Sequence, residues 1–189
     1  MKIFINPGHG MPDPGACGNG LRECDVVYRI GERVEKYLQA VGIETKLLQT
    51  DSPTRTLNEI CDPANDWGAD YFISIHCNSF NTYAHGTETF CYSYNSVAEK
   101  LANAIQERII KTIPELTDRG VRTADFAVLR KTNMPAVLVE TAFIDNPSDA
   151  KILVEHEDDF ARAISCGVTD FLSLPKPDLM TCPTCGQAI

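Results

Sequence analysis

Short apolar segments alternate with amphipathic segments of helical period along most of this chain, which limits the folds it can adopt. The short apolar segments predict strands over residues 2–6, 45–49, 71–75, 87–92, 126–129 and 136–139. Apolar residues spaced three or four positions apart predict helices over about 21–41, 52–67, 97–109 and 158–172. Asn146 followed by Pro147 predicts a further helix start. This alternation predicts an α/β fold, with a mostly parallel central sheet of about six strands flanked by helices.

The chain has 189 residues, which suits one domain with a small appendage. Its composition changes at the Pro-Lys-Pro of residues 175–177, so we predict a catalytic domain over 1–174 and a short tail over 175–189. The tail carries Cys182 and Cys185 in a Cys-x-x-Cys pattern, which is half of a four-cysteine zinc site. Two tails could supply four thiolates, bind a second zinc ion and clip a homodimer. The alternative is a disordered chain end.

Charge and hydropathy exclude several classes of partner. The chain has 17 Lys and Arg against 26 Asp and Glu, a formal net charge of −9, so we expect no binding to nucleic acid. No stretch approaches the ~18 apolar residues of a membrane span, so no membrane insertion is expected. The first residues lack the apolar run of a secretory signal, which predicts synthesis in the cytoplasm without a signal peptide.

Metal-competent side chains follow three of the predicted strands. His9 comes after the first strand, His76 after the third and Glu140 after the last, while Glu23 opens the first helix. Ligand sites in open α/β sheets form at the carboxyl ends of the strands, so these side chains could converge in one crevice. Two imidazoles and a carboxylate are a common catalytic zinc set, and a further carboxylate can act as the base.

Each of these residues also has a purely structural interpretation. His9 could cap a turn, His76 could be a hydrogen-bonded core histidine, and Glu23 could complement the helix dipole. Glu140 is harder to explain in this way, because a carboxylate directly after four apolar residues is costly to bury unless it is paired.

The same residues lie in stretches that resemble a known family, the zinc-dependent N-acetylmuramoyl-L-alanine amidases. The stretches are INPGHG, GNGLRE, ADYFISIHCNS, GTETFCY and a long segment from RGVRT to DAKIL, and the resemblance covers about residues 2–174. It implies that His9, Glu23 and His76 bind one Zn²⁺ and that Glu140 is the catalytic carboxylate. The implied reaction is hydrolysis of the amide between N-acetylmuramic acid and L-alanine in peptidoglycan.

Some positions extend or depart from this pattern. Arg130 and Asn78 are candidates for binding the substrate, although Arg130 could equally be a surface residue. Ala142 stands where the family commonly has Gly, and Glu59 stands where a second Arg is usual. The glycine matters only if the backbone there needs a positive φ.

The resemblance implies a phage or prophage endolysin, or a bacterial autolysin, that acts on the cell wall after release from the cytoplasm. Two alternatives remain open at this point. One is a non-catalytic zinc-containing regulator or binding module, and the other is a zinc peptidase on a related scaffold.

Overall fold

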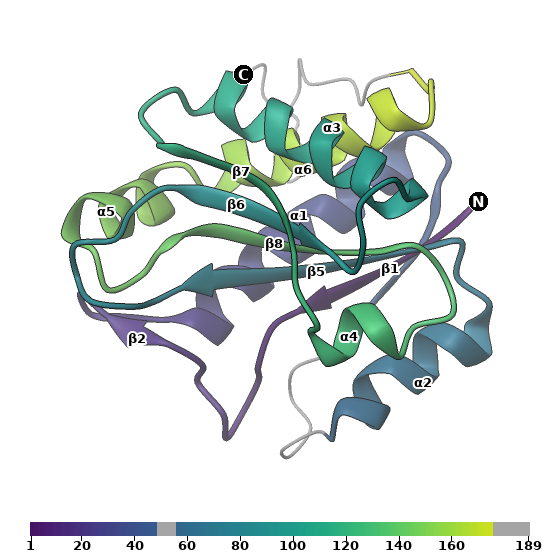
Figure 1. Cartoon of the computed structure of the whole chain (residues 1–189), viewed down its shortest axis with the longest axis horizontal. Coiled ribbons are helices and arrows are strands. Elements are labelled where there is room, and N and C mark those ends of the chain that lie inside the picture. The colour runs from purple at the N-terminus through teal and green to yellow at the C-terminus, as the bar shows by residue number, and fades with distance from the viewer. Residues whose placement is uncertain (49–55, 176–189) are drawn as a thin grey trace.

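A six-stranded sheet runs through the computed structural model, which describes residues 1–48 and 56–175 (Figure 1). The strands are β1 (Lys2–Pro7), β4 (Glu44–Leu47), β5 (Tyr71–Asn78), β6 (Thr87–Cys91), β7 (Asp118–Thr123) and β8 (Ala136–Phe143). They lie in the order β4-β1-β5-β8-β6-β7, and every neighbouring pair is parallel except β6 and β8. A separate small hairpin joins β2 (Cys17–Gly18) to β3 (Leu21–Arg22). The predicted α/β class with a mostly parallel sheet is confirmed.

Helices cover the two faces of the sheet unequally (Figure 1). The long helices α1 (Glu23–Ala40), α3 (Val97–Thr112) and α6 (Glu157–Phe171) pack on one face over the larger hydrophobic core. The other face carries α2 (Leu57–Trp67) and the short α4 (Ala127–Arg130) over a smaller core. Helix α5 (Pro147–Glu155) follows β8.

Alternation along the strands decides which side chains reach the less covered face. In β5, Ile73 and Ile75 enter the larger core, whereas Phe72 packs into the smaller core under α2 and α4. His76 has the same parity as Phe72 and therefore points to the same face. On β8, Glu140 shares that face in the same way, two residues beyond Leu138. The first halves of these strands are thus covered by helices, and the polar side chains nearer their carboxyl ends are left for a site.

Two sequence predictions at the sheet edge are corrected. Residues 126–129, predicted as a strand, contribute to helix α4, which Phe126 precedes as the N-cap. A four-residue apolar run carries no periodicity that separates a strand from a helical turn. The edge strand is instead β7, which the sequence analysis missed because its residues DRGVRT are mostly polar.

One local prediction is confirmed, and two predicted strand ends are corrected. Helix α5 begins at the predicted place, where the Asn146 side chain accepts hydrogen bonds from the backbone N–H groups of Ser148 and Asp149. Strands β5 and β8 run past their predicted ends, so that His76 and Glu140 lie within strands.

The two departures from the family pattern have local explanations. Glu59 forms a capping box with Thr56 at the start of α2. Ala142 is buried and has no positive φ, so the backbone there does not need glycine.

None of the helices in the described part of the chain is both long enough and apolar enough to cross a membrane. The tail from residue 176 onward lies outside the described residues, so the domain boundary at residue 174 stays a prediction.

We predict that Asp149→Ala destabilises the fold. The buried Asp149 Oδ2 accepts the backbone N–H groups of Gly86 (2.8 Å) and Phe143 (2.9 Å), tying the loop before β6 to the end of β8. Two buried donors left without an acceptor should lower the free energy of unfolding by about 3 kcal/mol, measured by urea denaturation. The exposed neighbouring residue Ser148 offers a control. Ser148→Ala should change the free energy of unfolding by less than about 0.5 kcal/mol. Equal effects of the two substitutions would contradict this role.

Candidate metal centre

The centre is built around the carboxylate of Glu23, the first residue of α1. This side chain is buried, and each of its oxygens meets one imidazole. His76 Nδ1 lies 2.9 Å from Oε1, and His9 Nε2 lies 3.2 Å from Oε2. The backbone N–H groups of Cys77 (3.0 Å) and Ala16 (2.8 Å) donate to the same two oxygens. Rigid backbone donors therefore hold the carboxylate in one orientation.

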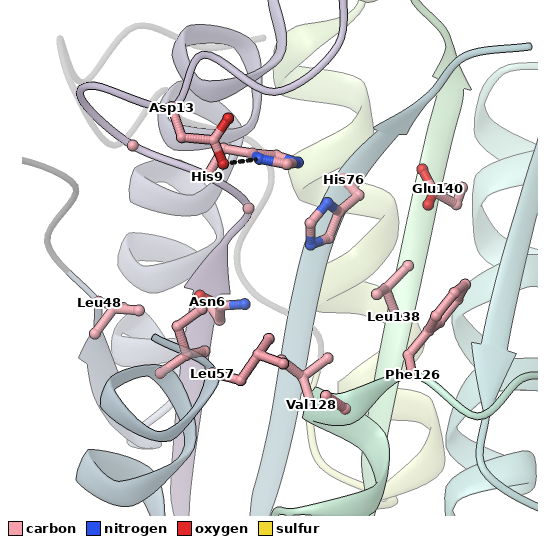
Figure 2. Close-up of a pocket in the computed structure, with 14 residues that line it drawn as sticks. Asn6, His9, Asp13, Leu48, Leu57, His76, Phe126, Val128, Leu138 and Glu140 are labelled. Carbon is pink, nitrogen blue, oxygen red and sulfur yellow. Dashed lines mark hydrogen bonds and ion pairs between the residues drawn. The ribbon is translucent and has the colours of Figure 1, made fainter. Parts of the chain in front are cut away.

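His9 sits in the turn after β1, between two glycines. Its φ is 62°, a conformation that is strained for a residue with a side chain and is often found at functional sites. The second ring nitrogen, Nδ1, lies 2.8 Å from Asp13 Oδ2 (Figure 2). A carboxylate on the far nitrogen orients the ring and fixes which nitrogen faces the centre, as around many metal-bound histidines.

Electrostatics in this cluster favour an ionised carboxylate at Glu23. Hydrogen bonds to Glu23 and, less strongly, to Asp13 raise the pKa of His9 to about 9 against the opposing effect of burial. Burial alone would raise the pKa of Glu23, but hydrogen bonds from His76 and His9 outweigh it and hold that pKa well below its usual range. Glu23 is therefore ionised throughout the physiological range, as a metal-ligating carboxylate must be.

Three side chains in the described part of the chain could together hold a metal ion. The candidate ligand atoms of His9, Glu23 and His76 all lie within 4.8 Å of one another. Two glycines make room for this arrangement. A Cβ atom at Gly15 would lie 2.5 Å from Glu23 Oε2, and one at Gly8 would lie 2.3 Å from His76 Cε1. The donor set and its glycine walls fit a small divalent cation with imidazole and carboxylate ligands.

Glu140 faces the cluster from the neighbouring strand. It is the register partner of His76 across the β5–β8 pair, and Figure 2 shows both side chains on the same side of the sheet. Burial, and after it the nearby carboxylates of Glu23 and Glu88, raise the pKa of Glu140 to about 7, although His76 and His9 oppose this. Its Oε2 is buried without a hydrogen-bond partner among the described residues. This carboxyl group is poised to exchange a proton near neutral pH.

A further buried carboxylate, Glu88 on β6, was missed by the sequence analysis. It is the register partner of Glu140 on the other side of β8. Arg122 (3.0 Å) and Arg119 (3.3 Å) of β7 pair with it, and Asn78 Nδ2 donates to its Oε1 at 2.8 Å. A charged residue within the otherwise uncharged strand TETFC could have indicated a buried carboxylate. Its arginine partners lie on β7, which the sequence analysis did not predict.

The cluster opens into a cavity of about 370 Å³. Figure 2 shows its two ends, with His9, His76 and Glu140 at one and apolar side chains from α2, α4 and the segments beside them at the other. The apolar side chains are those of Leu48, Leu57, Ile60, Phe126, Val128 and Leu138. The cavity can therefore hold a ligand that is polar where it meets the cluster and aliphatic farther along.

The remaining predicted site residues stand apart from this cavity. Arg130 is exposed and pairs with Asp125, and Asn78 is engaged with Glu88. Neither lines the cavity, and their contact with a substrate stays a prediction. Cys182 and Cys185 lie outside the described residues, so the tail-bound zinc ion and the tail-mediated homodimer also stay predictions.

Comparison with known proteins identifies the family. The family model described as N-acetylmuramoyl-L-alanine amidase matches residues 3–170. The chain belongs to the N-acetylmuramoyl-L-alanine amidase family. The resemblance seen in the sequence is thereby confirmed, and the family's fold is the one described above. The amidase AmiC2 of Nostoc punctiforme superimposes with a TM-score of 0.86 at 34% identity, covering 92% of this chain and 97% of that one.

Curated members of the amidase family include longer proteins. The sporulation-specific N-acetylmuramoyl-L-alanine amidase of Bacillus subtilis is 40% identical over 158 residues, which cover 81% of this chain and 60% of that relative. The endolysin of Bacillus phage SPP1 is 34% identical over 183 residues, covering 92% of this chain and 67% of the endolysin. The chain thus spans about 60% of the length of the sporulation-specific relative and 35% of B. subtilis LytC.

We predict that Gly15→Ala disables the metal centre of this family member. The added methyl group would collide with Glu23 Oε2 and His9 Cδ2, so affinity for Zn²⁺, measured by calorimetry, should fall about 10- to 100-fold. Gly20→Ala is a matched control, because Gly20 also has a positive φ (80°, against 68° at Gly15) but has no neighbouring atom within 4 Å of the new methyl group. Equal losses of Zn²⁺ affinity in both variants would show that backbone strain, and not the collision, is responsible.

Proposed function

We propose that this protein is a zinc-dependent hydrolase that cleaves the amide bond between N-acetylmuramic acid and L-alanine in peptidoglycan. The observation that carries the proposal is the placement of Glu140 beside the His9–Glu23–His76 cluster, with His9, His76 and Glu140 lining one cavity, in a chain that belongs to the amidase family. The printed names of its relatives, which include a sporulation-specific amidase and a phage endolysin, support a role in cell-wall degradation as an endolysin or an autolysin.

His9, Glu23 and His76 would hold the zinc ion. Two imidazole nitrogens and one carboxylate oxygen form a frequent catalytic zinc set that leaves a coordination position open. Bound there, zinc supplies a Lewis acid that polarises the scissile carbonyl and lowers the pKa of a water molecule. Asp13 holds the His9 ring in place from outside the cluster.

Glu140 would move the proton. Its carboxylate takes a proton from the attacking water and returns that proton to the nitrogen of L-alanine as the amide bond breaks. A group that both accepts and donates within one turnover works best when its pKa lies near the operating pH, and burial raises the pKa of Glu140 to about 7. The absence of a fixed hydrogen-bond partner on Oε2 among the described residues leaves that oxygen available for this exchange.

Product analysis of purified cell walls tests the reaction. An amidase should release free L-alanine amino termini without new reducing ends, and mass analysis should find intact glycan strands beside free stem peptides. New reducing ends would instead indicate cleavage of the glycan, and amino termini of residues farther along the stem would indicate a peptidase.

Replacement of Glu140 by glutamine should separate catalysis from metal binding. Glu140→Gln keeps the shape of the side chain but leaves an amide that cannot accept and return a proton in catalysis, so kcat on cell walls should fall about 10²- to 10⁴-fold. Zinc content, measured by atomic absorption, should remain that of the unaltered protein. A variant that retains full lytic activity would refute the role of Glu140.

Metal removal should abolish activity reversibly. Dialysis against a chelator should eliminate cell-wall hydrolysis, and stoichiometric Zn²⁺ should restore it. Ser148→Ala, a surface substitution away from the cluster, should respond to both treatments as the unaltered protein does. Undiminished hydrolysis in a metal-free preparation would overturn the assignment of zinc.

A further inference from the structure

The loop between β5 and β6, residues 79–86, presents two aromatic side chains to solvent. Phe80 is 78% exposed and Tyr83 is 83% exposed. Single apolar side chains at a surface are common, but two large rings this exposed within four residues form a feature that usually marks a contact site. We call residues 79–86 the aromatic loop.

The aromatic loop is held in a defined conformation. Asp145 Oδ2, in the connection between β8 and α5, accepts the backbone N–H groups of Phe80 (3.1 Å) and Thr82 (2.8 Å). Asn146 Nδ2 donates to the carbonyl of Thr82, whose φ of 64° is strained for a β-branched residue. Inside the loop, Asn81 Oδ1 accepts the backbone N–H of Tyr83. A strained backbone pinned at several points keeps the two rings displayed with little conformational entropy left to lose on binding.

The aromatic loop and the apolar end of the cavity lie on opposite sides of the metal centre. The loop continues from the carboxyl end of β5, four residues beyond His76 at Phe80, so their Cα atoms are at most about 14 Å apart. The apolar end of the cavity extends the other way, under α2 and α4. Figure 1 shows this separation, with the β5–β6 connection at the left and α2 and α4 at the lower right.

The two parts of a peptidoglycan substrate differ in the same way as these two surfaces. A stem peptide is a narrow chain with aliphatic side chains, which suits an enclosed cavity with an apolar wall. A glycan strand is a wide polymer that must remain outside, and its sugar rings carry apolar C–H faces that pack against aromatic rings. The aromatic loop has no Lys or Arg to pair with the headgroups of an anionic membrane, so a membrane surface is a poorer fit than a sugar surface.

We propose that Phe80 and Tyr83 form a stacking surface for pyranose rings of the glycan strand, next to the muramic acid whose amide is cleaved. This inference rests on the proposed function. In it, the aromatic loop positions the polymer while the cavity receives the stem peptide, so the enzyme acts better on glycan-linked stems than on isolated muramyl peptides.

The test compares three double variants on two substrates. Phe80→Ala with Tyr83→Ala removes both rings, and Phe80→Tyr with Tyr83→Phe keeps them. Tyr92→Ala with Tyr94→Ala removes two exposed tyrosines that follow β6; because β6 runs antiparallel to β8, these lie at the other end of the sheet. The substrates are intact cell walls and a soluble muramyl dipeptide. Co-sedimentation with glycan strands stripped of stem peptides measures binding independently of hydrolysis.

Loss of both rings should raise KM for cell walls at least about tenfold, leave hydrolysis of the muramyl dipeptide within about twofold, and abolish co-sedimentation with stripped glycan. The ring-conserving variant and the Tyr92–Tyr94 variant should resemble the unaltered protein in all three measurements. Unchanged binding and hydrolysis in the alanine variant, or equal loss on both substrates, would overturn the inference. If the unaltered protein hydrolyses neither substrate, the proposed function fails, and the co-sedimentation result alone then decides the inference.

Discussion

A buried carboxylate between two imidazoles is the constraint around which the rest of this structure is arranged. An ionised Glu23 is costly to bury unless its oxygens are satisfied, and here backbone N–H groups of Ala16 and Cys77 and the rings of His9 and His76 satisfy them. Those partners come from the turn after β1, the residue before β2 and the strand β5. The carboxylate therefore holds distant parts of the chain together, and the fold must place these segments within hydrogen-bond distance of Glu23.

The sheet positions the residues of the centre because helices cover its two faces to different extents. One face is covered by three long helices and supplies the larger hydrophobic core. The other is covered over only part of its area by α2 and α4, so the alternate residues of β5 and β8 change from apolar to polar along the strands. On that face Phe72 is followed by Ser74 and His76, and Leu138 by Glu140. The same face of each strand thus carries core residues first and residues of the centre after them.

Polar residues outside the centre hold its side chains in place or balance charge next to them. Asp13 orients His9 from outside, while Arg119 and Arg122 neutralise Glu88 next to Glu140. Beyond these contacts, the cavity under α2 and α4 and the exposed aromatic loop extend in opposite directions from the metal centre. This arrangement matches the proposed substrate, in which a peptide and a glycan meet at the bond to be cleaved.

The sequence alone determined the α/β class and the start of α5, because hydrophobic period and capping residues are local signals. Polar side chains at three strand ends and one helix start also pointed to the four residues that the structure brings together, and their roles stay a proposal. The sequence stretches also indicated the family. Tertiary structure decided what local signals do not carry. The apolar run 126–129 was predicted as a strand, but Val128 and Leu129 pack into the smaller core as part of α4. The polar edge strand β7 is defined by its pairing with β6. The contacts of Glu88 with Arg119 and Arg122 likewise depend on that pairing, since residues far apart in the chain meet only once the sheet has formed.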